Sequence, residues 1–252
     1  MRVGDRARTV VALPGIPVGA IGTVKEVGRL FLAVSFPDGR TGYYAHWQLA
    51  PAASGAHPAD AWAKMVDLGF SADQVPEGSH LCLLPETGQE ALAVAARFLT
   101  AGLQAGEHCQ CIAAPSWSAQ LRRAIAGLDL GLDQALVQAS LVFISPSECY
   151  LPPGEFTADG QLRRTEQAIR PHSGGKARTF SRPRRALVRQ MPPGAWWEYE
   201  RRATGLLQAL GVMAMCAYDP GAAGSQQWQS AEASHPYVVK SGRLLPGGAA
   251  SA

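Results

Sequence analysis

The chain has 252 residues, of which 47% are hydrophobic, and its formal net charge is +3 at pH 7. This length and composition allow a sizeable buried core, in one large domain or two smaller ones. The nearly balanced charge gives no bulk electrostatic reason to expect nucleic acid or a membrane surface as a partner. No apolar run approaches the ~20 residues that a membrane span requires.

The sequence also gives no sign of export. The first ten residues, MRVGDRARTV, contain no apolar signal core. The five cysteines are odd in number and scattered through segments that read as strands, which is not the pattern of a secreted disulfide framework. We therefore expect a cytoplasmic protein with free thiols and no membrane contact.

Residues 1–51 predict a small β-barrel. Segments 21–27 and 30–36 alternate apolar and polar residues, as strands do, and a turn sequence follows at 37–40. The most informative positions are Gly4-Asp5, Gly19-x-x-Gly22-x-Val24, Val34-x-Phe36-x-Asp38-Gly39 and Leu49-x-Pro51. This pattern resembles SH3-like modules of the KOW and Tudor kind. Such barrels host many functions, so the resemblance implies a binding module and no particular partner.

Residues 52–76 are expected to connect the barrel to a second domain. Residues 52–58 are rich in Ala, Ser and Gly, the composition of a flexible linker. Residues 59–68 follow, where Trp62, Met65 and Val66 suggest a short helix packed on one of the two domains.

Residues 77–245 predict an α/β domain with a mostly parallel sheet and helices on both faces, because strand-like and helix-like segments alternate. The segment 172–183 holds glycines, basic residues and Ser/Thr and is predicted to be a mobile loop, and residues 246–252 a disordered tail. The strands are placed at 80–84, 108–113, 140–145, 185–190, 212–218 and 237–240, and the helices at 88–104, 116–126, 157–170 and 198–210.

The turn between the first strand and the first helix of this domain lacks phosphate-binding residues. A P-loop, G-x-x-x-x-G-K-[ST], uses backbone N–H groups, a lysine and a hydroxyl to hold phosphates and magnesium. Here the turn reads Pro85-Glu86-Thr87-Gly88-Gln89-Glu90, with two carboxylates and no lysine. These carboxylates suit the helix dipole but would repel a triphosphate. We expect no ATP binding or hydrolysis, and the sequence indicates no other cofactor.

An ordered series of short motifs extends over residues 78–242. They are His80-x-Cys82, Phe98-Leu99-x-x-Gly102-Leu103-x-x-Gly106-Glu107, Tyr150-Leu151-x-x-Gly154-x-Phe156, Tyr199-Glu200, Cys216-x-Tyr218-Asp219 and His235-Pro236. Together they resemble the MEDS sensory domain, a family associated with methanogens, methylotrophs and the regulator of dichloromethane metabolism. The resemblance implies a RecA/KaiC-like fold with a degenerate P-loop, used as a small-molecule sensor.

The chain departs from the family pattern in two places. Pro85-Glu86 stands where the family often has an aromatic residue before Glu, and Arg189-Gln190-Met191 stands where it often has Gly-Glu-Met. The first departure alters the presumed ligand pocket. The ligand of this chain can therefore differ from those of its relatives.

The resemblance nominates the residues of a ligand pocket. RecA-like strand order would place the strand of Cys216 beside that of His80, and ligands of open α/β sheets bind at the carboxyl ends of strands. Thiols beside imidazoles suit a soft metal or an electrophilic ligand, whereas the alternative for each residue is ordinary core packing. The nominated residues are His80, Cys82, Glu86, Tyr199, Cys216, Tyr218 and His235.

One zinc site shared by His80, Cys82, Cys109 and Cys111 is excluded by geometry. In RecA-like order the two strands that carry these pairs lie three positions apart, about 14 Å at ~4.8 Å per strand. Zinc ligands lie ~2.0–2.3 Å from the metal. We interpret Cys109, Cys111 and Cys149 as buried, inert thiols, and the sequence identifies no metal.

Basic residues concentrate between 176 and 189. Such runs are usually solvated surface, and otherwise they mark an acidic partner or an anionic ligand. The candidates for that contact are Arg178, Arg182, Arg184 and Arg185.

The sequence contains no G-x-S-x-G, H-E-x-x-H or C-x-x-C motif, and no G-x-G-x-x-G after a strand. We predict a sensing and regulatory protein, for example in transcription, that binds a small ligand and signals through a protein partner. The sequence does not decide whether the chain forms a homo-oligomer. One alternative is an enzyme that uses Cys82 or His80, which requires an activated thiolate. The other is a nucleic-acid-binding regulator that uses the barrel and the arginine-rich loop, although no helix-turn-helix or RNA-binding signature supports it.

Overall fold

The computed structural model divides the chain into two compact units, Met1–Lys64 and Met65–Ala252. Within the part of the chain that the structure describes, no helix is long and apolar enough to cross a membrane. The described residues are 2–9, 20–27, 31–37, 39–45, 49–51, 65–128, 137, 139–151, 156–172, 177–183, 185–192, 194–219 and 225–248.

The first unit is an antiparallel five-stranded sheet. Its strands are in the order β4-β3-β2-β1-β5. Alternation along the strands buries one side, including Val24, Leu32, Val34 and Tyr44. The turn predicted at 37–40 joins β3 to β4, and Gly39 in this turn has a φ of +84°. The bounds are β1 (Arg6–Thr9), β2 (Ile21–Val27), β3 (Phe31–Ser35), β4 (Thr41–Ala45) and β5 (Leu49–Pro51).

The second unit is built on a seven-stranded sheet in the order β10-β9-β11-β12-β8-β13-β14. All neighbouring strands are parallel except β13 and β14, which form an antiparallel pair. As predicted, β12 lies beside β8 and β9 lies three positions from β8. The bounds are β8 (His80–Leu83), β9 (His108–Ile112), β10 (Leu141–Ile144), β11 (Ala177–Ser181), β12 (Met213–Ala217), β13 (Tyr237–Lys240) and β14 (Arg243–Pro246).

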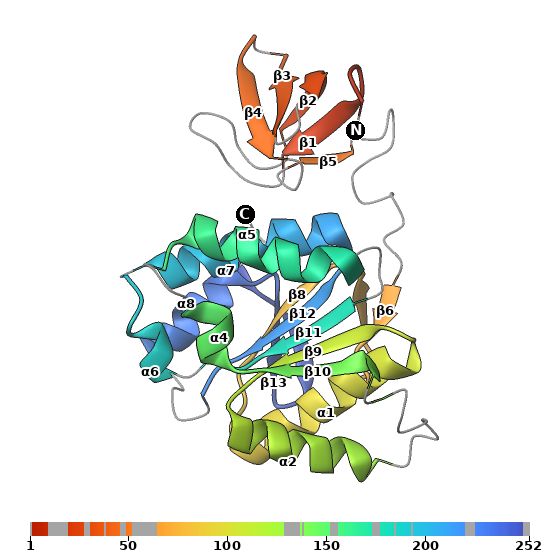
Figure 1. Ribbon diagram of the computed structural model, residues 1–252, viewed down its shortest axis with the longest axis vertical. Helices are drawn as coiled ribbons and strands as arrows, with labels where there is room; N and C mark the ends of the chain where they lie inside the picture. The colour runs from red at the N-terminus through yellow and green to blue at the C-terminus, as the bar shows by residue number, and fades with distance from the viewer. Residues whose placement is uncertain are drawn as a thin grey trace. The chain divides into compact units, whose positions relative to one another are not determined.

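Helices cover both faces of this sheet, with α1 and α2 on one face and α5 and α7 on the other (Figure 1). A short antiparallel pair, β6 (Met65–Asp67) and β7 (Gln74–Pro76), precedes the sheet in the chain. The helices are α1 (Gly88–Gln104), α2 (Pro115–Ala126), α4 (Pro146–Tyr150), α5 (Ala158–Ile169), α6 (Arg185–Val188), α7 (Ala195–Leu210) and α8 (Gln226–Ser234), with a 3₁₀ turn, η2, at Arg170–His172.

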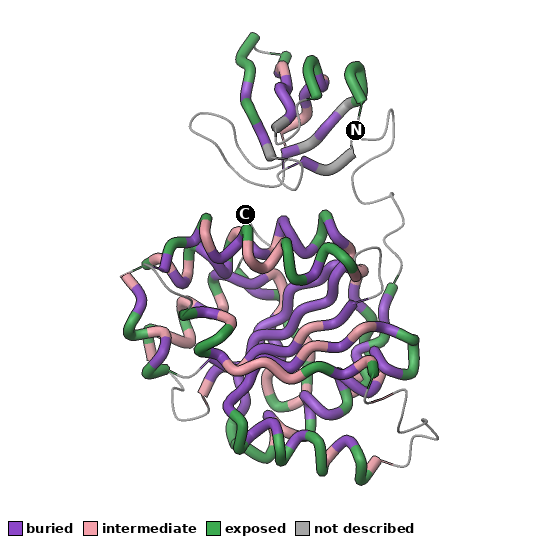
Figure 2. Tube along the Cα trace, in the orientation of Figure 1, coloured by how far each residue is buried: buried purple, intermediate pink, exposed green. Residues whose placement is uncertain are grey.

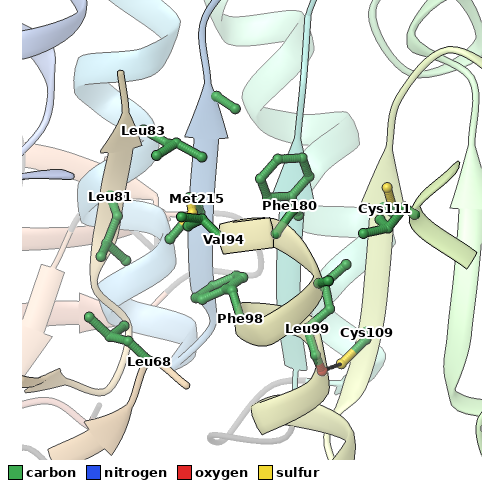
Figure 3. Close-up of a cluster of buried hydrophobic side chains, with 14 of the residues drawn as sticks. Leu68, Leu81, Leu83, Val94, Phe98, Leu99, Cys109, Cys111, Phe180 and Met215 are labelled. Atoms are coloured by element: carbon green, nitrogen blue, oxygen red, sulfur yellow. Dashed lines mark hydrogen bonds between the residues drawn. The ribbon is translucent and has the colours of Figure 1, made fainter. Parts of the chain in front are cut away.

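The central strands are buried on both faces, as parallel sheets covered by helices require. Figure 2 shows this as a continuous buried band through the middle of the unit. Towards α1, the side chains of Leu81, Leu83 and Met215 pack with Phe98 and Phe180, as Figure 3 shows. The alternate residues of the same strands point to α7 and α8, and they form a separate cluster that includes Cys82, Cys216 and Tyr218.

One strand of the sheet was predicted in the wrong place. We expected a strand at 185–190 and a mobile loop at 172–183, but β11 occupies Ala177–Ser181 and Arg185–Val188 form the helix α6. The arginine in ARTFS conceals the strand, because Arg178 is buried in an ion pair rather than exposed. Residues 173–176 lie outside the described residues.

The other differences concern short elements and ends. Of the helix expected at 59–68, residues 65–67 form the strand β6, and 59–64 lie outside the described residues, as does the linker at 52–58. The helices α4 and α8 and the strand β14 were not predicted. Of the predicted tail, Pro246 completes β14, and residues 249–252 lie outside the described part of the chain.

Candidate functional site

Four polar side chains from distant parts of the chain meet between the sheet and α7. They are His80, the first residue of β8; Glu200 in the second turn of α7; Cys216 of β12; and His235, which follows α8. One ligand atom from each of them lies within 4.8 Å of all the others. All four residues are buried, with at most 8% of their surface exposed.

The fold explains why these residues meet. In the register of β8 and β12, His80 pairs with Ala214, and Cys216 pairs with Cys82, so His80 and Cys216 are diagonal neighbours on one face of the sheet. Gly78, just before β8, has a φ of +82°, and a Cβ there would meet the Gln208 Cα at 2.8 Å. A glycine at this position therefore allows the start of β8 to approach α7.

Glu200 belongs to the buried stripe of α7. Trp196, Glu200, Ala203 and Leu207 are all buried and follow helical spacing, so the carboxylate must face the sheet. His235 reaches the same point from the carboxyl end of α8, where it is the residue after the last turn. Two strands and two helices therefore each supply one polar group.

Short distances link the four groups through one carboxylate oxygen. His80 Nε2 lies 3.4 Å from Glu200 Oε2 and 3.4 Å from Cys216 Sγ. His235 Nε2 lies 3.5 Å from the same Oε2, and the Cys216 thiol donates to it at 3.6 Å. The two imidazole rings have centroids 4.1 Å apart. The four donor atoms thus surround one small volume.

Outer hydrogen bonds hold three of the four groups, His80, Glu200 and His235, in this orientation. His80 Nδ1 lies 3.1 Å from the Thr204 hydroxyl, and His235 Nδ1 donates to the Ala231 carbonyl at 2.8 Å. The Tyr218 hydroxyl donates to Glu200 Oε1 at 3.0 Å. Both histidines therefore turn Nε2 inward, and the buried Nε2 of His235 has no hydrogen-bond partner in the structure.

Burial and mutual contact change the acid–base behaviour of the cluster. Burial, and then the neighbouring His235, lower the pKa of His80 to about 4. Burial alone would raise the pKa of Glu200, but the neighbouring His235 and His80 rings bring it to about 2. Burial and the Glu200 charge raise the pKa of Cys216. At neutral pH the cluster therefore contains a buried carboxylate, a neutral His80 and a protonated thiol.

The other nominated residues divide into near and distant ones. Tyr218 contacts Glu200 directly, and Cys82 packs in the same cluster as Cys216 and Tyr218. Tyr199 is buried, but its hydroxyl pairs with Thr165 at 3.1 Å. Glu86 is exposed, and its carboxylate accepts from the Ser241 hydroxyl at 2.7 Å. Tyr199 and Glu86 thus have partners outside the four-residue group.

Neither Glu200 nor Thr204 was nominated from the sequence as a site residue, and the site was expected at the carboxyl ends of the strands. The cluster lies instead on the face of the sheet under α7, since His80 is at the amino end of β8. A signal for Glu200 was present in the sequence: it is the acidic member of an otherwise apolar helical stripe. Thr204 lies one turn further along α7 and carries no comparable signal.

The turn before α1 uses its own side chains to satisfy its amides. Thr87 caps the helix, and its hydroxyl accepts from the backbone N–H of Glu90 at 3.1 Å. The Glu90 carboxylate in turn accepts from the backbone N–H of Glu86 at 2.7 Å. A phosphate bound here would have to displace these contacts, because N–H groups at a helix start are the usual phosphate donors.

The structure corrects the interpretation of Arg178 as a surface contact. It is 1% exposed, and its Nε and Nη2 donate to Glu107 at 2.7 and 3.1 Å. Its Nη1 donates to the carbonyls of Phe98 and Asp67. Arg178 therefore ties β11 to α1 and to the β6 strand, a structural role.

Arg182 and Arg185 lie near the carboxyl ends of β11 and β12. Arg182 pairs with Asp219 at 3.3 Å, and its guanidinium lies 5.5 Å from the centroid of the Trp117 ring. The exposed Arg185 donates its backbone N–H to Asp219. Arg184 lies outside the described residues.

A surface pocket of about 430 Å³ lies elsewhere, beside the carboxyl ends of β9 and β10. Its walls include Ser118, Arg122, Phe143 and Glu148. The Arg122 guanidinium lies 3.8 Å from the centroid of the Phe143 ring, so this side chain is held by the wall of the pocket. None of the seven nominated residues lines this pocket.

Comparison with known proteins agrees with the fold. Residues 79–236 match the family model MEDS, the methanogen/methylotroph, DcmR sensory domain. A KaiC-like protein from the hyperthermophilic archaeon Pyrococcus horikoshii OT3 has a similar structure, with a TM-score of 0.51 and 18% identity over 71% of this chain and 80% of that chain. At this identity the likeness concerns the fold alone. None of the curated proteins compared matches the chain. Because the family model spans more than half of the chain, this protein belongs to the MEDS family of sensory domains.

Proposed function

We propose that the chain is a small-molecule sensing and regulatory protein whose sensing centre is the cluster of His80, Glu200, Cys216 and His235. The observation that carries this proposal is the convergence of four buried polar groups in a family of sensory domains. Polar groups in a protein interior cost free energy unless they are paired. A buried carboxylate beside a neutral His80 and a protonated thiol is thus a feature that needs a function or a bound species to explain it.

The cluster is also in a suitable position to transmit a signal. It joins β8 and β12 in the centre of the sheet to α7 and to the end of α8. Any species that binds there changes the contacts of Glu200 and His235, and hence the packing of the two helices on the sheet. Transmission from these helices to a partner protein, with the five-stranded unit as an SH3-like contact module, completes the proposal.

Catalysis by a thiolate has less support. Burial raises the pKa of Cys216 and of Cys82, so both thiols are protonated at neutral pH. A nucleophilic cysteine needs an open, positive environment that lowers its pKa. ATP-dependent action has equally little support, because the amide of Glu86 before α1 and that of Glu90 in its first turn are bonded to Glu90 and Thr87 side chains.

Native mass spectrometry of the full chain purified from its source tests the proposal. We expect a retained mass in the wild type, its loss in Glu200→Gln, and its retention in Cys111→Ala, which alters a buried thiol in the other core cluster. A panel of small metabolites, scored by shifts in melting temperature, serves as the second measurement. The proposal fails if the wild type retains nothing and no compound shifts its melting temperature.

A further inference from the structure

The donor atoms of the cluster have the chemistry of a metal site. Two imidazole nitrogens, one thiolate sulfur and one carboxylate oxygen form a mixed set that borderline metals such as Zn²⁺ accept. The cysteine and the two histidines exclude Mg²⁺ and Ca²⁺, which require oxygen ligands. The described residues contain this one group of such ligands within mutual reach.

The spacing of the donors fits a four-coordinate ion. Zinc binds nitrogen at ~2.0–2.1 Å and sulfur at ~2.3 Å, which puts the atoms of a tetrahedral set ~3.3–3.6 Å apart. The separations between donor atoms that link the cluster are 3.4, 3.4, 3.5 and 3.6 Å. The two remaining pairs of donor atoms lie within 4.8 Å of each other.

His235 supplies an independent observation. Its Nδ1 donates to the Ala231 carbonyl, so that Nε2 is the ring atom that faces the cluster. This fully buried Nε2 has no hydrogen-bond partner and lies 3.5 Å from a carboxylate oxygen. These two atoms attract each other when a positive charge lies between them, either a proton on Nε2 or a metal ion. A metal ion satisfies both atoms.

The outer contacts match those of metal-bound residues. Metal-binding histidines commonly give their other N–H to a carbonyl, a carboxylate or a hydroxyl, and ligating carboxylates are themselves hydrogen-bonded. Here the partners are the Ala231 carbonyl for His235, the Thr204 hydroxyl for His80 and the Tyr218 hydroxyl for Glu200. Three of the four donors are therefore oriented before any ion arrives.

We infer that His80, Glu200, Cys216 and His235 bind one four-coordinate Zn²⁺ through Nε2, Oε2, Sγ and Nε2. Binding releases the Cys216 thiol proton, and His80 takes the tautomer in which Nδ1–H donates to Thr204. Four protein donors leave no open position, as in structural zinc sites. The inference concerns the same site as the proposed sensing function and rests on it for any regulatory meaning, but zinc binding itself is independent of it.

Titration of chelator-treated full chain with Co²⁺, a spectroscopic substitute for Zn²⁺, tests the inference. We expect one Co²⁺ per chain, visible bands of tetrahedral intensity, a thiolate charge-transfer band, and displacement by one equivalent of Zn²⁺. Cys216→Ala is expected to lose the charge-transfer band and to bind at least tenfold more weakly. The matched control, Cys111→Ala, also removes one buried strand thiol, and its spectrum is expected to stay that of the wild type.

X-ray absorption of the zinc-loaded wild type needs no variant. One sulfur neighbour at ~2.3 Å with three nitrogen or oxygen neighbours at ~2.0–2.1 Å is the expected result. A folded wild type that binds no stoichiometric ion, a shell without sulfur, or a charge-transfer band that persists in Cys216→Ala overturns the inference. A zinc-loaded protein that retains no organic ligand and responds to no metabolite would refute the sensing function and leave the metal site standing.

Discussion

The two faces of the seven-stranded sheet bury different kinds of side chain, although they alternate along the same strands. Towards α1, β8 and β12 present Leu81, Leu83, Met213 and Met215, which join a large apolar core. Towards α7, the same strands present His80 and Cys216, which meet Glu200 and His235. Apolar packing stabilises the fold, whereas buried polar groups cost stability unless they are paired. The α1 face therefore mainly stabilises the fold, and the α7 face carries the polar groups that can bind a ligand or a metal ion.

The buried ion pair of Arg178 and Glu107 lies on the α1 face, and breaking it is expected to have the largest effect. Arg178→Met leaves Glu107 as a buried unpaired charge, which we expect to lower the free energy of unfolding by about 3–5 kcal/mol. Chemical denaturation measures the loss. Combining it with Glu107→Leu removes the second charge and is expected to recover much of the stability.

The control for this prediction is Arg185→Met, which changes an exposed arginine and is expected to alter the free energy of unfolding by less than about 0.5 kcal/mol. A similarly small change for Arg178→Met would contradict the structural role of the ion pair. It would favour the sequence-based prediction that Arg178 is an exposed residue that contacts a partner or an anion.

The pH dependence of stability further distinguishes the two faces, because His80 and Glu200 on the α7 face contribute to it. His80 has a pKa of about 4 in the folded chain against an ordinary value of 6.5, so the unfolded chain binds the proton more readily. Stability is then full above about pH 6.5 and falls as the pH drops towards 4, by about 3 kcal/mol at ~1.36 kcal/mol per pKa unit. The pKa of Glu200, about 2 against an ordinary 4.5, extends the loss from about pH 4.5 downward.

Denaturant titrations of metal-free protein across this pH range provide the measurement. His80→Gln is expected to flatten the slope between pH 6.5 and 4, while Cys216 and His235 stay in place around it. The stacked pair of His108 and His172 contributes in the same direction, since burial lowers the pKa of His108, and it persists in the variant. An unchanged slope in His80→Gln would show that the α7 face does not control the acid response.

Glu200→Gln tests whether function and stability separate on the α7 face. The change removes a buried charge but keeps the shape of the side chain, so the metal-free variant is expected to unfold within about 1 kcal/mol of the wild type or to be more stable. The rise in melting temperature on adding Zn²⁺ is expected to disappear, because stabilisation follows binding to the native state. Thermal unfolding with and without Zn²⁺ gives both values. A loss of several kcal/mol without metal would mean that Glu200 is needed for folding.

The smallest expected effect is that of nucleotide. Calorimetric titration with Mg·ATP is expected to show no heat of binding, because Thr87 and Glu90 occupy the amides before α1 and no lysine follows Gly88. The same titration with Thr87→Ala controls for the cap. Micromolar binding by the wild type would indicate a functional site at the start of α1. It would contradict the assignment of ligand binding to the α7 face.

Much of the α/β unit was predictable because local signals and the strand order agree. The helix at 88–104 was predicted with the bounds that α1 has, since Thr87 caps its start and Gly106, with a φ of +74°, follows its end. The resemblance to the MEDS family nominated His80, Cys216, Tyr218 and His235, which do come together. It also nominated Glu86 and Tyr199, which pair elsewhere.

The sequence by itself determined which segments are strands and helices wherever apolar periodicity and caps coincide, and it excluded one zinc site shared by His80 and Cys109. Only the tertiary structure decided the roles of the charged residues. Arg178 reads as a surface residue until Glu107 is brought to it, and Glu200 gains its partners only when α7 turns it towards the sheet. The physical reason is that the cost of burying a charge depends on partners distant in sequence, and a single sequence does not reveal that pairing.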